Sequence, residues 1–322
     1  MKDRHGRRIG YLRLSLTAAC QMRCTYCRPD WLRKGGDANQ LTASEIESVV
    51  RHLVSRHGLS KVRLTGGDPT ARPDLMEIMT RLGAVDGIDD LAMTTNGLSL
   101  SRFAADYAAA GLQRLNVSLD SLDPARFERM TGIDGLARVR RGIDAAIDAG
   151  LEPLRLNTVV LAGENDAELP DLVRFAAARG LEIRFIELMP MGPLADQWAD
   201  RYVPESRMRA RIDPIVETWR PLEQGHDSAR RFALRLDDGS PATVGFITPM
   251  SCNFCAACNR LRLTSDGKIY PRLMDEPRGS FLEAVRPSFD PECFDRVLAR
   301  ALEAKADEHP ARGVAVMTTI GG

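Results

Sequence analysis

The chain has 322 residues, of which 44% are hydrophobic and 27% are charged, as in an ordinary globular protein with a sizeable core. Its 44 basic and 44 acidic side chains give a formal net charge of zero, which argues against a nucleic-acid-binding protein. No apolar run reaches the length of a membrane span, and the first residues, MKDRHGRR, lack the apolar core of a signal peptide. We therefore expect a cytoplasmic protein with neither a membrane nor a nucleic-acid partner.

Short β-rich runs alternate with stretches of helical hydrophobic period over the first part of the chain. One helix is expected to begin at Thr42, where Glu45 completes a capping box, and another to end at Gly150. Repeated strand–helix alternation predicts a parallel sheet with right-handed crossovers, in either an open doubly wound sheet or a partial barrel. The six expected strands are 11–17, 61–67, 91–97, 114–120, 153–160 and 182–190.

The two faces of these strands favour the barrel. In the first strand, Leu12 and Leu14 share one face while Arg13 and Ser15 share the other, and three further strands alternate in the same way. A sheet with helices on both faces would be apolar on both. We therefore predict an α/β fold in which residues 1–220 form a partial (βα)6 TIM-like barrel around a large polar ligand. In the sixth strand, the pattern does not settle which way Arg184 faces.

After residue 220 the pattern changes to hairpins, with turns expected at Asp238-Gly239 and Asp266-Gly267 and a helix at about 290–305. We expect residues 221–322 to form a C-terminal α+β extension that carries a second cysteine loop.

Six of the seven cysteines fall into two tight groups, and the remaining one, Cys293, is expected to be a packing residue. Cys20, Cys24 and Cys27 come directly after the first strand, at the end of the barrel where active sites lie. In a reducing compartment such a group indicates a metal. Three thiolates suit a [4Fe–4S] cluster with one open iron, and a structural zinc ion with a fourth ligand from elsewhere is the alternative.

The CxxxCxxC motif after the first strand, followed by TGGDP after the second, resembles the radical S-adenosylmethionine (SAM) superfamily. The resemblance implies that SAM binds the open iron and that one electron from the cluster cleaves it to a 5′-deoxyadenosyl radical. Glycines in the second motif would let the backbone approach the methionyl amino group of SAM.

Further motifs narrow the resemblance to the MoaA family, the GTP 3′,8-cyclases of molybdenum cofactor biosynthesis, over nearly the whole chain. They are GRRIGYLRLSLT, KVRLTGGDP, TTNG, LNVSLDS, FIELMPMG, FCAACNRLRLTSDGK and a terminal Gly-Gly. This implies a lyase that converts GTP to (8S)-3′,8-cyclo-7,8-dihydroguanosine 5′-triphosphate, the first step of the pathway. The alternatives are a related enzyme that acts on another nucleotide with an altered or absent second cluster, a peptide-modifying enzyme, and a non-catalytic metal-binding protein.

The resemblance also implies site residues and partners. The expected GTP ligands are Arg13, Lys61, Arg63, Thr94, Arg155, Arg184, Arg260, Leu261 (through its backbone) and Arg262. The expected SAM ligands are Tyr26, Gly67, Ser118 and Met189. Independently of the resemblance, several cations converging on one face of a neutral protein indicate a polyanion such as a triphosphate. A reductant such as flavodoxin or ferredoxin and a downstream cyclic pyranopterin synthase are the expected protein partners, and a homodimer is left open.

The second cysteine loop departs from the family pattern, because Arg272 stands where the family has its last cluster cysteine. Cys252, three residues before Cys255, is the candidate replacement, so that Cys252, Cys255 and Cys258 would hold a second [4Fe–4S] cluster. The alternatives are that Cys252 is incidental, or that the loop binds zinc. The smaller departures are Ala18, where the family usually has aspartate, Asp68, where it more often has glutamate, and Arg155, where it more often has lysine. The resemblance implies that the terminal TTIGG enters the active site, and a frayed terminus is the alternative.

Overall fold

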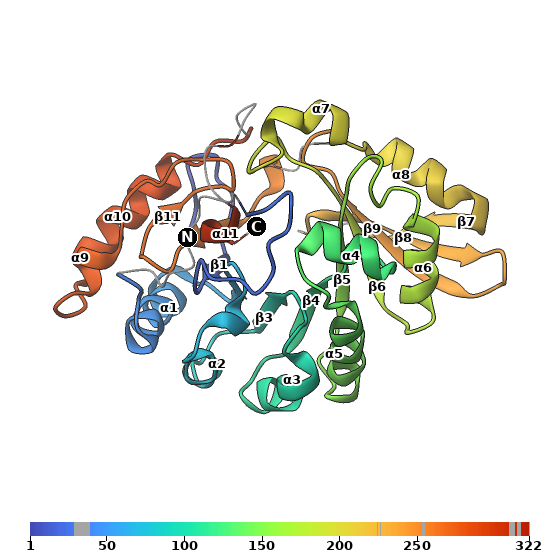
Figure 1. The fold of residues 1–322 in the computed structure, drawn as a ribbon. Coiled ribbons are helices and arrows are strands. Elements are labelled where there is room, and N and C mark those ends of the chain that lie inside the picture. Colours follow the sequence, from blue (N-terminus) through green and yellow to red (C-terminus); the bar gives the residue numbers. More distant parts are fainter. Residues whose placement is uncertain are drawn as a thin grey trace.

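The chain folds around one curved β-sheet, which a computed structural model describes for residues 1–28, 39–223, 225, 227–252, 255–308, 313 and 317–321. In this part of the chain the sheet has eleven strands, in the order β11-β10-β1-β2-β3-β4-β5-β6-β9-β8-β7. The strands at the two ends of that order do not pair, so the barrel is open, as predicted. Figure 1 shows the curved sheet with helices along its outer side and the C-terminus near the middle of its concave side.

The six predicted strands form the centre of the sheet as parallel neighbours in sequence order. Five of them end two or three residues before the predicted limit, because the chain turns away at the carboxyl end of the strand, whereas β5 ends at the predicted residue, Val160. They are β1 (Tyr11–Ser15), β2 (Lys61–Thr65), β3 (Asp90–Thr95), β4 (Arg114–Ser118), β5 (Arg155–Val160) and β6 (Glu182–Glu187).

Both predicted hairpins are present, and each adds a parallel strand to an edge of the barrel. β9 (Pro241–Ile247) pairs parallel with β6, and β10 (Arg260–Leu263) pairs parallel with β1. The antiparallel outer strands are β8 (Ala229–Leu236), β7 (Val216–Pro221) and β11 (Ile269–Tyr270). The expected division at residue 220 is therefore crossed by one continuous sheet.

The predicted helix boundaries rest on the expected local interactions. At the start of α1 (Ala43–His57), the Thr42 side chain accepts a hydrogen bond from the backbone of Glu45, and the Glu45 carboxylate accepts one from the backbone of Thr42. α5 (Leu136–Asp148) is followed by Gly150, whose φ of 70° is the left-handed conformation that ends helices. The other helices of the outer layer are α2 (Leu75–Gly83), α3 (Leu100–Ala109), α4 (Pro124–Thr131) and α6 (Leu169–Ala177).

The remaining helices lie after the central strands. They are α7 (Trp198–Arg201), α8 (Glu205–Ile212), α9 (Leu282–Val285), α10 (Pro291–Glu303) and α11 (Met317–Ile320), with short 3₁₀ turns at η1 (Pro69–Ala71), η2 (Ala195–Gln197), η3 (Asp213–Ile215) and η4 (Cys255–Ala257). Cys293 lies in α10 and is half-buried against the core, as predicted. Among the described residues, none of the helices has the length and apolar character needed to cross a membrane.

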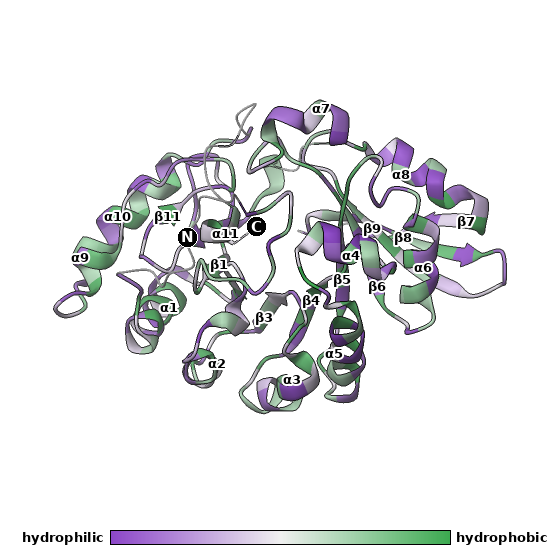
Figure 2. Cartoon of the chain, in the orientation of Figure 1, coloured by the Kyte–Doolittle hydropathy of each residue, from purple (hydrophilic) through white to green (hydrophobic). Residues whose placement is uncertain are grey.

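The core lies between the sheet and its outer helices. Leu12 and Leu14 of β1 and Val62 and Leu64 of β2 are fully buried there. The helices meet this layer with one hydrophobic side and leave the other hydrophilic, as α5 and α10 show in Figure 2. The opposite face of the sheet carries polar side chains, which positions them on the concave side of the molecule.

Candidate active site

A cavity of about 460 Å³ lies on the polar face of the sheet. Among the described residues that line it, the basic ones are Lys61 and nine arginines, whereas Asp227 is the one acidic residue. The structure brings together eight of the nine predicted GTP ligands on its walls: Arg13, Lys61, Arg63, Thr94, Arg155, Arg184, Arg260 and Arg262. Leu261 is not among the lining residues because its side chain is buried in the core, so its proposed backbone contact stays a prediction.

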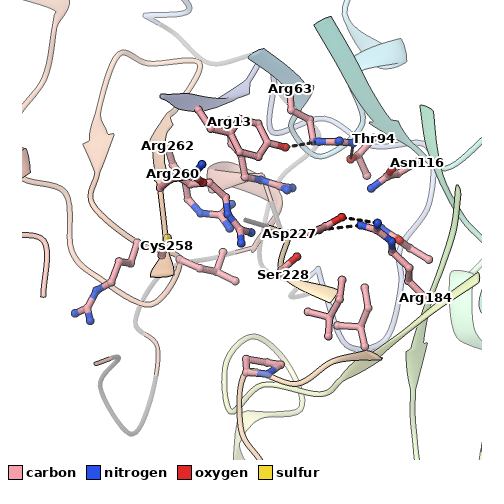
Figure 3. Close-up of a pocket in the computed structure, with 18 of the residues that line it drawn as sticks. Arg13, Arg63, Thr94, Asn116, Arg184, Asp227, Ser228, Cys258, Arg260 and Arg262 are labelled. Carbon is pink, nitrogen blue, oxygen red and sulfur yellow. Dashed lines mark hydrogen bonds and ion pairs between the residues drawn. The ribbon is translucent and has the colours of Figure 1, made fainter. Parts of the chain in front are cut away.

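Three arginines stand side by side across neighbouring strands. Arg13 of β1 is in register with Arg262 of β10 on one side and with Arg63 of β2 on the other. Like charges directly opposite each other on adjacent strands destabilise a sheet. Figure 3 shows Arg13 and Arg262 with their guanidinium groups gathered in the cavity. This row is an arrangement that a bound anion would stabilise.

A second row lies two residues earlier on the same strand face. Tyr11 of β1 is in register with Arg260 of β10 and with Lys61 of β2. The Tyr11 hydroxyl accepts a hydrogen bond of 2.5 Å from Nε of Arg63, so the tyrosine ties the two rows together. The two rows form a cationic surface over β10, β1 and β2.

Burial and the repulsion between like charges lower the pKa values of two arginines on this surface. Burial, together with the neighbouring charges of Arg63 and Arg260, lowers the pKa of Arg13 to about 10. Burial also lowers the pKa of Arg262 well below its ordinary value, and the charges of Arg13 and Arg260 lower it further. Arginine keeps its charge in proteins at neutral pH, so the free protein holds mutually repelling cations in this cavity.

On the other side of the cavity, the arginines pair with carboxylates. Nη2 of Arg184 donates to Asp227 at 2.6 Å (Figure 3). Nε of Arg184 donates to Glu182. Glu182 also accepts from Nε of Arg155 at 3.3 Å and from Nε of Arg231 at 3.1 Å. Burial opposes the ionisation of Asp227, but the charge and hydrogen bonds of Arg184 outweigh it and hold the pKa of Asp227 well below its ordinary value.

The structure settles which way Arg184 faces. Arg184 and Ile186 of β6 line the cavity, whereas Glu187 is the last strand residue and points away from it. Glu187 is 1% exposed and accepts hydrogen bonds from the backbone of Met250 and Ser251, both at 3.0 Å. Met189 lies beyond the end of the strand, where the alternation no longer applies, and it lines the cavity, while its predicted contact with SAM stays a prediction.

The first cysteine loop lies at the carboxyl end of β1, and Cys20, Cys24 and Cys27 are all half-buried. Burial raises the pKa of the Cys20 thiol to about 11 and that of Cys27 to about 12. Backbone hydrogen bonds tie the loop to the end of α4, from the amide of Arg23 to the carbonyl of Thr131 at 2.8 Å and from Thr25 to Met130 at 2.9 Å. Three half-buried thiols therefore sit in a loop that is fixed in place.

The TGGDP turn packs directly beneath this loop. A Cβ added to Gly67 would lie 2.4 Å from the carbonyl oxygen of Ala19, and one added to Gly66 would lie 2.5 Å from that of Thr17. The glycines are thus needed for close approach to the backbone that leads to Cys20. This approach is to protein rather than to a ligand, and the predicted contact of Gly67 with SAM stays a prediction.

The carboxylate of Asp68 joins the ends of two strands. It accepts hydrogen bonds from the backbone of Thr70 at 2.9 Å, from Oγ1 of Thr95 at 2.9 Å and from the backbone of Asn96. Burial raises the pKa of Asp68, and these hydrogen bonds oppose that shift. The aspartate in place of the commoner family glutamate is therefore fully engaged in holding the turn.

Tyr26 anchors the cysteine loop to β4. Its hydroxyl donates to Oδ2 of Asp120 at 2.7 Å, and Oδ1 of Asp120 accepts from the backbone of Val159 at 2.9 Å. Burial raises the pKa of Asp120 to about 6. Ser118 is half-buried at the end of β4, two residues before Asp120. Neither Tyr26 nor Ser118 is among the described lining residues of the cavity, so their contact with SAM also stays a prediction.

The second cysteine loop lies at the amino end of β10, opposite to the first loop, which follows the carboxyl end of the neighbouring β1. Cys255 and Cys258 line the cavity, and Nζ of Lys305 lies 3.4 Å from Sγ of Cys258. The same ammonium donates to the carbonyl oxygens of Arg260 at 2.8 Å and Pro271 at 2.7 Å, and its side chain is fully buried. Lys305 therefore holds the two sides of the loop together beside the sulfur.

Cys252 and Arg272, the two residues at issue in this loop, are placed differently. Cys252 is exposed and is not among the described residues that line the cavity. Arg272 lines the cavity, and Asp275 accepts from its Nε at 2.8 Å and from its Nη2 at 2.6 Å. Its Nη1 is buried without a hydrogen-bond partner. The structure leaves the predicted ligand role of Cys252 as a prediction.

The C-terminal tail enters the site from the concave side. The carbonyl oxygens of Ile320 and Gly321 accept hydrogen bonds from Nη1 of Arg262. A Cβ added to Gly321 would clash with Oγ1 of Thr65. The φ of Gly321 is 70°, which also disfavours any residue other than glycine at this position. Gly322, the other residue of the predicted Gly-Gly end, lies outside the described residues.

Several residues of the cavity were not among the predicted ligands. Tyr11, Asn116 and Asn157 have the same strand parity as predicted ligands, so the alternation that identified Arg13 could have identified them. Asp227 and Lys305 lie outside the strands, and no periodic pattern in the sequence connects them to the site.

Comparisons with known proteins agree with this geometry. The chain matches the Radical SAM superfamily over residues 14–176 and the family Molybdenum Cofactor Synthesis C over residues 181–311. It is 39% identical to the GTP 3′,8-cyclase of Alkaliphilus oremlandii over 96% of the chain and 94% of that protein. It is 39% identical to the enzyme of the same name from Pelotomaculum thermopropionicum over the whole of both chains. It is 45% identical to GTP 3′,8-cyclase 1 of Pseudomonas aeruginosa over 83% of this chain and 80% of that protein.

Among solved structures, the fold is similar to that of Streptococcus suis SuiB. The structure of SuiB bound to S-adenosylmethionine aligns with a TM-score of 0.60 at 15% identity, over 86% of this chain and 64% of SuiB. The structure of SuiB bound to its precursor peptide aligns with the same TM-score at 14% identity, over 96% of this chain and 75% of SuiB. At this identity the likeness concerns the fold alone.

Proposed function

The chain belongs to the family of radical SAM enzymes named GTP 3′,8-cyclase, and from that premise we propose that it converts GTP to (8S)-3′,8-cyclo-7,8-dihydroguanosine 5′-triphosphate. This is the first step of molybdenum cofactor biosynthesis. The observation that carries the proposal for this chain is the pair of cationic rows over β10, β1 and β2, which lie in one cavity between the two cysteine loops.

The first cysteine loop fits a [4Fe–4S] cluster with SAM. Cys20, Cys24 and Cys27 share one half-buried loop. Any side chain in place of Gly66 or Gly67 would clash with the backbone that leads to Cys20. When bound, the cluster supplies the one-electron cleavage of SAM that starts the radical reaction. The protein's own part is to fix the loop, through the Tyr26–Asp120 hydrogen bond and the Asp68 turn. We assign SAM binding to Tyr26, Gly67, Ser118 and Met189.

The cationic rows are the proposed site for GTP. Guanidinium groups form paired hydrogen bonds with phosphate oxygens, and an anion between Arg13, Arg63 and Arg262 would offset their mutual repulsion. On the opposite wall, the carboxylate of Asp227 already satisfies Arg184, so that arginine binds substrate only if Asp227 gives way. We assign GTP binding to Arg13, Lys61, Arg63, Thr94, Arg155, Arg184, Arg260, Leu261 and Arg262.

The second cysteine loop is the proposed site of a second [4Fe–4S] cluster. Cys255 and Cys258 face the cavity, and the buried Lys305 beside Cys258 supplies positive charge for a thiolate-bound cluster. We propose Cys252 as the third ligand, which requires its exposed side chain to turn toward the other two. A related enzyme with an altered second cluster, acting on another nucleotide, is the competing proposal, and the substitution of Arg272 for a cysteine favours it.

The remaining partners are proposals that follow from the chemistry. The reaction needs a one-electron donor such as flavodoxin or ferredoxin, and its product would pass to cyclic pyranopterin synthase. We place both steps in the cytoplasm and leave a homodimer open. A peptide substrate is disfavoured, because a peptide does not require a wall of nine arginines.

An anaerobic assay tests the proposal directly. The protein is reconstituted with iron and sulfide and incubated with SAM, dithionite and either GTP, ATP or no nucleotide. We expect 5′-deoxyadenosine in all reactions, and a cyclised guanosine triphosphate, identified by mass spectrometry, in the reaction with GTP. Formation of 5′-deoxyadenosine without any cyclised GTP would reject the cyclase and support the related enzyme. Absence of SAM cleavage in protein that carries a complete first cluster would reject both.

A further inference from the structure

A separate group of metal-ligating side chains lies where α10 meets the last turns of α1. Nε2 of His52 is 2.8 Å from Oδ1 of Asp295, and Nε2 of His57 is 2.7 Å from the same oxygen. All three ligand atoms lie within 4.8 Å of one another. None of these residues is among those that line the cavity, so the group is distinct from the site already described.

One wall of this group is rigid and the other is open. The His52 ring is 9% exposed and packs edge-on against Phe294, with ring centroids 5.0 Å apart, and against Phe289 at 5.2 Å. This packing fixes the ring with Nε2 directed at Asp295. The side chains of His57 and Asp295 are 22% and 37% exposed, so water and ions reach the group from that side.

We propose that His52, His57 and Asp295 form a binding site for a divalent transition-metal ion, with Zn²⁺ as the preferred ion. Two imidazoles and one carboxylate are a ligand set that zinc accepts, with water completing the tetrahedron on the exposed side. Zinc–ligand bonds of about 2.0–2.1 Å place neighbouring ligand atoms roughly 3.3 Å apart. Each histidine Nε2 therefore needs to lie about half an ångström farther from Oδ1 of Asp295 than it does in the present hydrogen bonds.

The ion would join two parts of the chain that are distant in sequence. His52 and His57 belong to the segment that matches the radical SAM superfamily, and Asp295 belongs to the segment that matches the C-terminal family. α10 ends at Glu303, two residues before the Lys305 that contacts Cys258. An ion at this point would fasten the C-terminal segment to α1. This inference does not depend on which nucleotide the cavity binds.

The test uses the full chain with reconstituted clusters and with any purification tag removed. Wild-type protein and the variants His57→Ala and Asp295→Asn are dialysed anaerobically against low-micromolar ZnCl₂, and zinc and iron are counted per chain. The matched control is His5→Ala, because His5 also faces a carboxylate, that of Asp307 at 3.9 Å, and the described residues supply no third ligand there. We expect one zinc in the wild type and the control, and at least about tenfold weaker binding in the other two variants.

X-ray absorption at the zinc edge separates this site from the cysteine loops. The proposal predicts a first coordination shell of nitrogen and oxygen in the wild type, and a zinc-dependent rise in thermal stability that His57→Ala abolishes. Sulfur in the zinc shell, zinc content that His57→Ala leaves unchanged, or no zinc retained by the wild type would each overturn it. Because the shell is measured on the wild type, the proposal is decided even if a variant does not fold.

Discussion

The substitution Arg13→Met distinguishes the effect of the cationic rows on stability from their effect on GTP binding. Arg13 is the central member of the row, with Arg262 and Arg63 in register on its two sides. Methionine keeps a long flexible side chain that packs in the same space but removes the charge. We expect this variant to bind GTP more weakly and, without nucleotide, to be more stable than the wild type.

The size of the gain in stability follows from the pKa of Arg13. Burial and the charges of its neighbours lower that pKa to about 10, well below the ordinary value of an arginine. A folded-state pKa depressed below the unfolded value means that the charged arginine is disfavoured in the folded protein, and this cost is present at every pH below about 10. The shift corresponds to roughly 3 kcal/mol at most. We therefore expect the apparent melting temperature to rise by a few degrees, about 2 °C for each kcal/mol recovered.

The loss in binding is opposite in sign. A hydrogen bond between a charged donor and a phosphate oxygen contributes about 1.5–3 kcal/mol, so removing it should weaken GTP binding about 10- to 100-fold. Calorimetric titration of GTP into the reconstituted protein measures the affinity, and scanning fluorimetry at one fixed scan rate measures stability. Arg51→Met, at an exposed arginine of α1, is the matched control and should change neither. An Arg13→Met protein that is less stable than the wild type, or that binds GTP equally well, would refute the reasoning.

Four further predictions concern the cysteine loops and the tail. Alanine at Cys20, Cys24 or Cys27 should abolish SAM cleavage, and undiminished 5′-deoxyadenosine from such a variant would contradict the first cluster site. Deleting Gly321 and Gly322 should impair GTP cyclisation while leaving the first cluster assembled, because Arg262 loses the carbonyl of Gly321, and full turnover would count against this. The wild type should contain about eight iron and eight sulfide per chain and Cys252→Ala about four, whereas a wild type with one cluster would remove Cys252 from the ligand set. Glu187→Gln should leave the first cluster intact but reduce the iron content of the second. The reason is that a neutral side-chain amide binds the backbone amides of Met250 and Ser251 less strongly than a carboxylate does. Unchanged iron content in this variant would show that Glu187 does not position the second cysteine loop.

The order of the fold was predictable because it depends on local pattern. Alternation along β1 identified the face of Arg13, and the Thr42 capping box and Gly150 marked helix ends that the structure confirms. The joining of β9 and β10 to the barrel edges was not predictable, because a hairpin pattern carries no information about which distant strand it will pair with. The facing of Arg184 was unresolved for a related reason: alternation stops at the strand end, and the sequence does not show that β6 ends at Glu187.

The residues of the site also divide into those that were predictable from the sequence and those that were not. Side chains on regular strands were brought together as expected, since register and parity fix their direction. Contacts made by loops were not foreseen, because their partners are remote in sequence. Asp227 reaches Arg184 from 43 residues away, and Lys305 reaches Cys258 from 47 residues away. The environment of Arg272 belongs to the same group, since its pairing with Asp275 depends on how the chain turns after β11.

The parallel pairing of β10 with β1 determines how the two cysteine loops share one cavity. The first loop follows the carboxyl end of β1, whereas Cys258 precedes the amino end of β10 by two residues. Because the two strands run in the same direction, these loops lie at opposite ends of the strand pair, separated by about 13–17 Å for four to five residues. The arginine rows lie on the strands between them, and the cavity opens on that face. An antiparallel β10 would have brought both loops to the same end. The observed direction instead leaves room, between the two cysteine loops, for a ligand as long as a nucleoside triphosphate.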